Sequence, residues 1–283
     1  MEFCSLSSGS SGNALVVGEE GRYFLVDCGI SANRVTACLA QVQIPVSQIE
    51  GIVVTHEHSD HILGVGALAR RLRIPVYAGD LVWEAMEKPL GRLTGDQKRT
   101  VIDKASVAGM HVDFFATSHD CRQGKGIRVT GRFGTLGVLT DTGMLTERMH
   151  QVLTGCTCIV IEANHDLDRL WRGSYPQSLK KRVAGVCGHL SNVQAAEGLC
   201  RWVQSNTQRV VLAHLSEENN TPELALRTVC SILRDSPVKR RCPRLKIRVA
   251  PRYGPHELIT MEDPGMNGSI AATEDSMALG KEA

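Results

Sequence analysis

The chain has 283 residues, of which 42% are hydrophobic and 22% are charged, and its formal net charge is +2. This length and composition are ordinary for a globular protein with a sizeable core, built as one large α/β domain or two small ones. The nearly neutral balance does not point to nucleic acid, and an aromatic content of 4% argues against a platform of stacking aromatic side chains.

Alternating apolar runs and amphipathic patterns predict strands and helices over most of the chain. The predicted strands are 14–17, 23–26, 52–54, 75–78, 112–115, 127–132, 136–140, 159–162, 210–213 and 245–249. The predicted helices are 31–41, with Ser31 as N-cap, and 67–72, 175–186, 192–204 and 222–233. Early hairpins followed by alternating helices and strands predict an α/β protein, a sandwich of two sheets with helices outside.

A single domain is predicted over residues 1–262. The remaining segment, 263–283, is small and polar and is expected to be disordered. The sequence shows neither a secretory signal pattern nor an apolar run of the roughly 18 residues that span a bilayer. A cytoplasmic location without membrane contact is therefore expected, in which the ten cysteines would be reduced.

Three histidines, a glutamate and an aspartate crowd into H-E-H-S-D-H, directly after a short apolar run. Residues two apart in an extended segment point the same way, so His56 and His58 would face one point while Glu57 faces away. Where the chain turns into a helix, Asp60 and His61 would face a neighbouring direction. The hexapeptide thus offers two half-sites of a two-metal centre, and imidazole with carboxylate suits zinc, manganese or iron.

Three further polar residues each follow a predicted strand, where loops converge on one edge of a sheet. Asp141 in T-D-T-G could bridge two ions. His119 in T-S-H-D could complete the first site, and His214 in A-H-L-S the second. A lone histidine of this kind is more often a structural or surface residue, but the hexapeptide reverses those odds.

One segment, P-V-K-R-R-C-P-R-L-K-I-R-V-A-P-R, is strongly basic, with seven Lys and Arg residues between Lys239 and Arg252 and no acid. The plainer interpretation is a solvated loop followed by an edge strand that its charge keeps from pairing. The alternative is a contact with the phosphate backbone of a nucleic acid.

The pattern T-H-x-H-x-D-H, with F-L-V-D-C-G around Asp27, resembles the metallo-β-lactamase superfamily of metallohydrolases. Further motifs narrow the resemblance to its YycJ/WalJ branch over about residues 1–260. These are S-L-S-S-G-S-S-G-N, T-D-T-G, I-E-A-N-H-D, G-S-Y-P-Q-S-L-K-K-R-V, G-H-L-S-N and A-H-L-S-E-E-N-N-T-P-E. The sequence departs from the family after His119, where D-C-R-Q-G-K-G-I replaces Asp-Ala and a Pro-x-Gly-aromatic turn, so the wall of the site there is expected to differ.

The resemblance implies a four-layer αββα sandwich that binds two divalent metal ions, zinc or manganese. The implied ligands are His56, His58, His119 and Asp141 for one ion, and Asp60, His61, Asp141 and His214 for the other. Asp27 would not be a ligand. It would lie beneath the cluster and hydrogen-bond the loop that presents the histidines.

The motif G-H-L-S-N is similar to the paired histidine motifs of ribonuclease J-type nucleases. By that analogy His189 would stabilise the scissile phosphate or protonate the leaving oxygen, and Ser191 and Asn192 would bind phosphate oxygens. The alternative is a helix-capping Ser-Asn pair beside an incidental histidine. Only 48 residues (189 − 141) separate Asp141 from His189, which leaves no room for the inserted capping domain of those nucleases.

The resemblance implies a dinuclear-metal phosphodiester hydrolase, with DNA as substrate and 5′→3′ exonuclease activity. In two-metal hydrolysis a water acidified by the ions attacks phosphorus, and Asp60 or Asp141 could orient it. Two other functions stay open: hydrolysis of small thioesters or lactones, and a non-catalytic regulatory module that binds metal. The motif G-H-L-S-N favours phosphate chemistry over hydrolysis of thioesters or lactones. The complete ligand set argues against a non-catalytic module.

Overall fold

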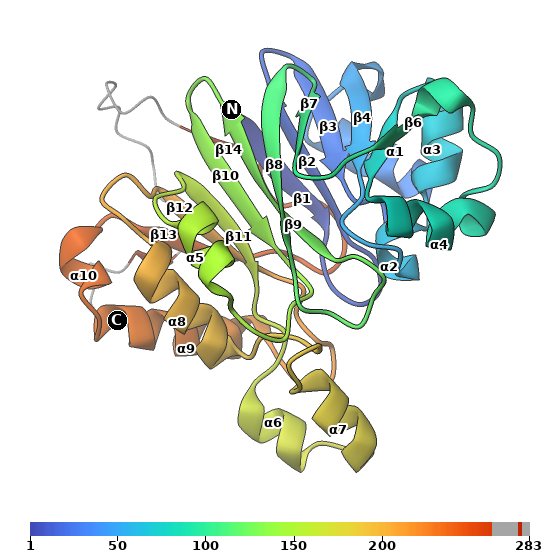
Figure 1. Cartoon of the computed structure of the whole chain (residues 1–283). Coiled ribbons are helices and arrows are strands. Elements are labelled where there is room, and N and C mark those ends of the chain that lie inside the picture. Colours follow the sequence, from blue (N-terminus) through green and yellow to red (C-terminus); the bar gives the residue numbers. More distant parts are fainter. Residues whose placement is uncertain (262–276, 279–283) are drawn as a thin grey trace. The chain divides into compact units, whose positions relative to one another are not determined.

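The computed structural model describes residues 1–261 and 277–278, and the chain divides into two units (Figure 1). Unit 1 contains Met1–Ala116, Asp120–Arg132 and Ala250–Thr260. Unit 2 contains Thr117–His119, Phe133–Val249 and the described residues from Met261 onward. The predicted disordered segment lies outside the described residues except for Met277 and Ala278, and the single-domain assignment stays a prediction.

The sheet of unit 1 runs β14-β1-β2-β3-β4-β5-β6. Its strands are β1 (Glu2–Ser7), β2 (Ala14–Glu19), β3 (Arg22–Val26), β4 (Ile49–Val53), β5 (Val76–Ala78), β6 (Lys98–Thr100) and β14 (Ile259–Thr260). Strands β1, β2 and β3 are antiparallel neighbours, as the predicted early hairpin requires, whereas β3 to β6 are parallel. Three more strands, β7 (Lys104–Val107), β8 (Met110–Ala116) and β9 (Lys125–Gly131), pair antiparallel in that order.

Helices cover the parallel part of this sheet because each has one apolar face. They are α1 (Ala32–Gln41), α2 (Ser59–Ile62), α3 (Val65–Leu72) and α4 (Asp80–Leu90), with 3₁₀ turns η1 (Val46–Gln48) and η2 (Gly95–Gln97). The α1 helix begins as predicted, because the Ser31 side chain accepts a hydrogen bond from the Arg34 backbone N–H. Leu25, Ile52 and Leu68 are wholly buried in one core cluster between helices and strands.

Unit 2 is built on four parallel strands in the order β10-β11-β12-β13, with β15 (Met277–Ala278) antiparallel to β13. They are β10 (Gly134–Leu139), β11 (Cys158–Glu162), β12 (Arg209–Ala213) and β13 (Lys246–Val249). Its helices are α5 (Glu147–Leu153), α6 (Leu167–Arg172), α7 (Gln177–Val183), α8 (Asn192–Trp202), α9 (Pro222–Arg234) and α10 (Val238–Arg241). Helices α8 and α9 lie side by side, and α9 packs on β13 (Figure 1).

Most predicted elements are present, and the helix expected at 175–186 is the shorter α7. Elements that were not predicted include β1, β6, β7, β14, α4, α5, α6 and α10. The E-F-C-S-L-S of β1 contains no β-branched residue, so its sequence gives a weak strand signal. His150 on α5 lies outside the predicted site, and its Nδ1 accepts a hydrogen bond from the indole N–H of Trp202 at 2.8 Å. Among the described residues, no helix is long and apolar enough to cross a bilayer.

The polar residues of interest follow the carboxyl ends of parallel strands in both units. Asp27 comes directly after β3, Glu162 ends β11 and His214 comes directly after β12. Asp27, Asp141 and His214 have φ angles of 61°, 56° and 54°. A left-handed conformation costs a non-glycine residue roughly 1 kcal/mol, and such strain gathers where side-chain direction matters. At all three positions the backbone therefore holds a candidate site residue where a strand ends.

Candidate metal centre

In unit 1, the loop that presents the histidines is held by Asp27. One carboxylate oxygen accepts a hydrogen bond from the Thr55 backbone N–H at 2.8 Å. The other accepts from the Thr55 hydroxyl at 2.8 Å and lies 2.8 Å from His61 Nδ1. Asp27 is only 3% exposed, so these bonds form away from water. Asp27 thus fixes the loop and holds the His61 ring through Nδ1, and its supporting role beside a metal ion stays a prediction.

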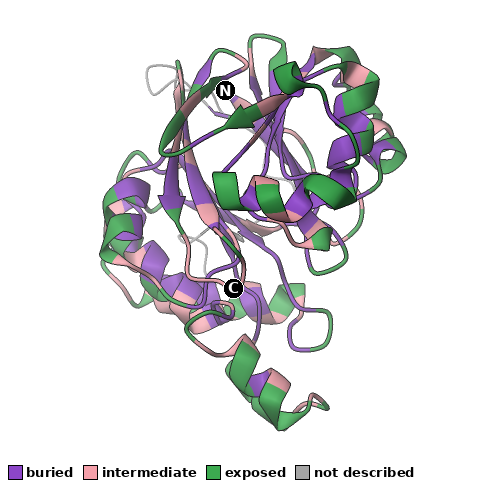
Figure 2. Ribbon diagram, turned by 45° about the vertical axis from the view of Figure 1, so that its right-hand side comes forward, coloured by how far each residue is buried: buried purple, intermediate pink, exposed green. Residues whose placement is uncertain are grey.

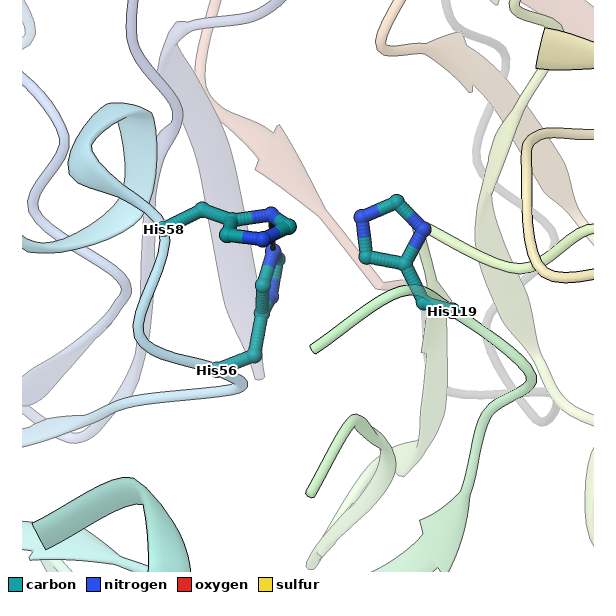
Figure 3. A group of neighbouring side chains, drawn as sticks. All are labelled: His56, His58 and His119. Atoms are coloured by element: carbon teal, nitrogen blue, oxygen red, sulfur yellow. Dashed lines mark hydrogen bonds between the residues drawn. The ribbon is translucent and has the colours of Figure 1, made fainter. Parts of the chain in front are cut away.

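His56 and His58 place their imidazoles against each other, as the period of an extended segment predicts (Figure 3). His56 Nε2 lies 3.1 Å from His58 Nδ1, and the rings meet edge to face at 79°. Two nitrogens that bind one tetrahedral zinc at about 2.0–2.1 Å are about 3.4 Å apart. The observed separation therefore fits two ligands of a single ion.

Asp60 and His61 form a second pair in unit 1, on and beside the first turn of α2. Asp60 Oδ2 lies 3.6 Å from His61 Nε2. The Asn13 amide nitrogen lies 3.1 Å from His61 Nε2 and 3.3 Å from Asp60 Oδ2. A side chain at Gly29 would collide with the Asp60 carbonyl, so glycine is needed for this close approach. Asn13, in the S-S-G-N motif, is a site residue that sequence reasoning did not assign.

Glu57 lies apart from both pairs. Its Oε1 accepts a hydrogen bond from the Arg122 backbone N–H at 2.6 Å, while Oε2 is buried with no hydrogen-bond partner among the described residues. The carboxylate therefore braces the 120–123 loop of unit 1 and is not directed at the histidine pairs.

In unit 2, His119 sits in the loop between β8 and β9 and is the third side chain drawn in Figure 3. Its Nδ1–H donates to the Gly188 carbonyl at 3.1 Å, so Nε2 is the candidate ligand atom. The neighbouring Ser118 donates its hydroxyl proton to the Val186 carbonyl at 2.7 Å. Burial lowers the pKa of His119 against the opposing effect of Asp141, which favours the neutral imidazole. The hydrogen bonds of His119 and Ser118 hold this histidine in place, although the segment that follows, D-C-R-Q-G-K-G-I, departs from the family pattern.

Asp141 is surrounded by histidines of unit 2. Its Oδ1 lies 3.6 Å from His119 Nε2, 3.6 Å from His214 Nδ1 and 3.7 Å from His189 Nδ1. The carboxylate is 3% exposed, and a buried charge of this kind has to be compensated by cations. One carboxylate oxygen at similar distances from two predicted ligands is the arrangement that a bridging aspartate needs.

Glu162 is a second acidic residue at this edge, and sequence reasoning assigned it no role. It is wholly buried at the end of β11. Its Oε1 accepts a hydrogen bond from the Thr142 backbone N–H at 2.7 Å, and its Oε2 lies 3.0 Å from His189 Nδ1. Burial alone would raise the pKa of Glu162, but hydrogen bonds from His189 and His214 outweigh it and lower that pKa. Glu162 is therefore an ionised partner for His189.

Donor atoms in unit 2 lie close enough to hold a metal ion. Those of His119, Asp141 and His189 lie within 4.8 Å of one another, and so do those of Glu162, His189 and His214. Imidazole and carboxylate donors are the ligand types of zinc and manganese sites. The residues present therefore fit a divalent transition metal.

Ser191 and Asn192 are engaged in holding the backbone. Ser191 is the N-cap of α8, where its hydroxyl accepts from the Gln194 backbone N–H in a capping box. The Asn192 amide pairs with the Asn220 amide at 3.1 and 2.8 Å. The capping role left open by the sequence is thus present, and the phosphate-binding role of both residues stays a prediction.

His165, in I-E-A-N-H-D, is also wholly buried. Burial lowers its pKa to about 4, so the ring is neutral at physiological pH. Its backbone carbonyl accepts from the Asn192 N–H at 2.9 Å, and the neighbouring Asn164 amide donates to the His214 carbonyl at 3.0 Å. This segment ties the two histidine motifs together.

Replacing Asp27 with alanine is expected to weaken metal binding by about 10- to 100-fold, because outer partners of ligand histidines have effects of that size. The Thr55 N–H and His61 Nδ1 would lose their acceptor. Titration with zinc or manganese in a metal buffer measures the change. Asp27→Asn is the matched control, since it keeps an acceptor for Thr55 but removes the charge. Its metal affinity should lie between that of the wild type and that of Asp27→Ala. Metal affinity unchanged in Asp27→Ala would contradict this role.

Comparison with known proteins places the chain in a family. Residues 8–131 match the metallo-beta-lactamase superfamily. The chain is 38% identical over 237 residues to exodeoxyribonuclease YycJ of Bacillus anthracis, covering 83% of this chain and 90% of that protein. It is also 38% identical over 236 residues to exodeoxyribonuclease WalJ of Streptococcus pneumoniae, covering 82% and 88%. The chain belongs to the metallo-β-lactamase superfamily, and within it to the group that contains YycJ and WalJ.

A solved structure supports the fold. The metallo-β-lactamase fold protein YhfI from Bacillus subtilis superposes with a TM-score of 0.66 at 14% identity, covering 90% of this chain and 99% of that chain. The predicted fold class, the α/β sandwich with two mixed sheets flanked by helices, is confirmed.

Proposed function

We propose that the chain is a metal-dependent phosphodiesterase that degrades DNA, acting as a 5′→3′ exonuclease. The observation that carries the proposal is the Glu162–His189 pair beside Asp141, because hydrolysis of a small ester has no evident need for it. Extensive identity to two proteins named exodeoxyribonucleases supports DNA as the substrate class.

The proposed centre binds two divalent ions, zinc or manganese. The assignment is the one that the family resemblance implies: His56, His58, His119 and Asp141 for one ion, and Asp60, His61, Asp141 and His214 for the other. The spacing of the donor atoms within each unit supports the assignment.

Bound divalent ions would supply Lewis acidity and lower the pKa of water toward 7. The side chains of the chain then have distinct tasks. Asp60, whose side chain is 24% exposed, would accept a hydrogen bond from the attacking water and orient it. His189 shares its Nδ1 proton with Glu162, so its Nε2 remains for a phosphate or leaving oxygen. The hydrogen bond to buried Glu162 would hold the His189 ring in a fixed orientation.

The direct test is an assay of purified protein, reconstituted with zinc or manganese, on 5′-labelled single- and double-stranded DNA, RNA and a chromogenic phosphodiester. We expect stepwise release of nucleotides from DNA, at a rate that falls steeply with salt because phosphate contacts release counterions. If the protein cleaves none of these substrates, the proposal is overturned. If it cleaves only a thioester or a lactone, the small-molecule hydrolase is favoured.

A cytoplasmic location is part of the same proposal. All ten cysteines, which lie in the part of the chain that the structure describes, are free thiols. Free thiols are typical of reducing compartments. DNA is the proposed partner.

A further inference from the structure

Between Glu162 and His189 the chain leaves the sheet of unit 2 and forms a short helical hairpin, α6 and α7. We call residues 166–186 the arm. In Figure 1 the arm stands away from α8 and α9 of the same unit. Candidate site residues flank the arm on both sides in the sequence. Glu162 precedes it at the end of β11, and His189 follows it. The arm is therefore attached directly to the carboxyl edge of the parallel strands.

The arm carries a charge that the whole chain does not show. Residues 166–186 contain five Lys and Arg residues and two aspartates, a net charge of +3, while the complete chain has +2. Most of this surface is exposed (Figure 2). A nearly neutral composition thus conceals a local positive surface of the kind that attracts phosphates.

Some of these cations hold the arm together. Lys180 is 5% exposed, and its Nζ donates to the Trp171 carbonyl at 2.9 Å, which joins α7 to α6. Arg169 donates to the Glu218 carbonyl at 3.4 Å. Arg172 and Lys181 are exposed, and neither forms an ion pair with a described residue. These two side chains are therefore available to a ligand.

A hollow lies beside Arg172, between the arm and the loop that follows His214. It has a volume of about 300 Å³ and is lined by Arg169, Arg172, Gly173, Ser174, Glu218 and Asn219. A side chain at Gly173 would approach the Arg169 carbonyl to 2.7 Å, so glycine keeps the turn tight. The two guanidinium groups and the Ser174 hydroxyl are donors that suit a phosphate group, and with the opposing Glu218 carboxylate the lining keeps a net charge of +1 (2 − 1).

Trp171 adds an apolar contact on the same helix. Its side chain is 45% exposed, whereas Trp202 is wholly buried. An indole exposed to this extent is accessible to a ligand, and its flat ring can stack on another ring. The low aromatic content excludes an extended stacking platform, but a single tryptophan is enough to stack one unpaired base.

The other basic segment, 239–252, begins at the opposite edge of the sheet. Lys239 and Arg240 lie on α10, which precedes β13, and β11, β12 and β13 are parallel. These side chains therefore lie near the amino ends of the strands, while His189 and His214 lie at the carboxyl ends. The plainer interpretation, a solvated basic surface, suits this part of the segment.

We infer that the arm is the docking surface for a single-stranded segment of DNA, which rests on the proposed function. Arg172 and Lys181 contact its phosphates, and an unpaired base stacks on Trp171. A strand held there runs toward the Glu162–His189 edge.

The test measures binding of the full chain to a fluorescein-labelled, phosphorothioate-linked single-stranded 20-mer by fluorescence anisotropy over a range of salt concentrations. Arg172→Gln with Lys181→Gln should weaken Kd about tenfold or more at low salt. It should also reduce the slope of log K against log salt by about 1.4, because each phosphate of a single strand that the protein neutralises adds about 0.7 to that slope. Trp171→Ala should weaken Kd about tenfold, and Trp171→Phe should recover most of that loss.

Lys239→Gln with Arg240→Gln is the matched control, because it removes the same charge from the opposite edge and should leave Kd within about twofold. Equal weakening by both double variants would overturn the inference, since only overall charge would then matter. The inference would also be overturned if the arm variants bound the 20-mer with the wild-type Kd. The same holds if Trp171→Ala weakened binding to a protein partner but not to the 20-mer. If the wild-type chain neither binds nor cleaves DNA, the proposed function itself fails. If it cleaves DNA and the arm variants bind normally, only this inference fails.

Discussion

Replacing Asp60 with alanine is expected to lower kcat/KM for DNA hydrolysis by about 10³-fold or more while the protein stays folded. Asp60 is proposed both to bind an ion and to orient the attacking water, and loss of a few kcal/mol of such stabilisation corresponds to this factor. Its side chain is 24% exposed, and the hydrogen bond that it accepts from the Asn13 amide is long, at 3.3 Å. Little packing is therefore lost with the carboxylate. Initial rates on 5′-labelled DNA and the metal content of the purified protein measure the effect.

The control comes from the same hexapeptide. Glu57→Ala removes an equal charge three residues away, but Glu57 braces the Arg122 backbone and is not directed at the histidines. We expect Glu57→Ala to keep wild-type metal content and activity within a few-fold, with a small loss of thermal stability. Near-normal turnover by Asp60→Ala would show that the carboxylate has been wrongly assigned.

Replacing His189 with alanine is expected to lower kcat by about 10²- to 10⁴-fold, the range for loss of a general acid. Its Nδ1 lies 3.0 Å from Glu162 but 3.7 Å from Asp141, so the ring pairs with the glutamate first. The metal content should therefore stay at the wild-type value. Kinetics on DNA combined with metal analysis separate a missing acid from a missing ligand.

Two further variants sharpen this result. His214→Ala should lose metal as well as activity, because His214 is proposed as a ligand. Glu162→Gln keeps an acceptor for the Thr142 N–H but removes the charge beside His189, so we expect kcat to fall by about 10- to 100-fold with metal retained. If His189→Ala lost an ion as His214→Ala does, His189 would be a ligand and the proposed acid would have to be found elsewhere.

The hexapeptide could be interpreted from sequence because its geometry is local. His56, His58 and Glu57 are neighbours in an extended segment, where alternation alone decides which side chains share a side. The structure gives a 3.1 Å separation for the two histidines and a contact with Arg122 for Glu57. The start of α1 at Ser31 followed from the same kind of local rule.

Glu162 shows where this reasoning stopped. In sequence it is the last residue of a predicted strand, and such a position is ordinarily solvated. Its burial depends on a contact with His189, 27 residues away, and on the Thr142 N–H. The sequence did contain a signal, because Glu162 directly continues the apolar run of a predicted strand. A glutamate in such a place is rarely buried unless it is paired. For Ser191 the capping box with Gln194 was equally visible in sequence.

Local order along the chain is enough to indicate the class of chemistry, because it sets the donor types, their spacing in the hexapeptide and the strand ends that carry the other donors. The groups that support these donors depend on tertiary contacts. Asn13 reaches Asp60 and His61 from 47 and 48 residues away, and Glu162 reaches His189. The positive arm likewise became visible only when α6 and α7 were placed at one sheet edge. The physical reason is that burial and charge pairing are set by side chains from distant segments, whereas backbone periodicity acts only between neighbours.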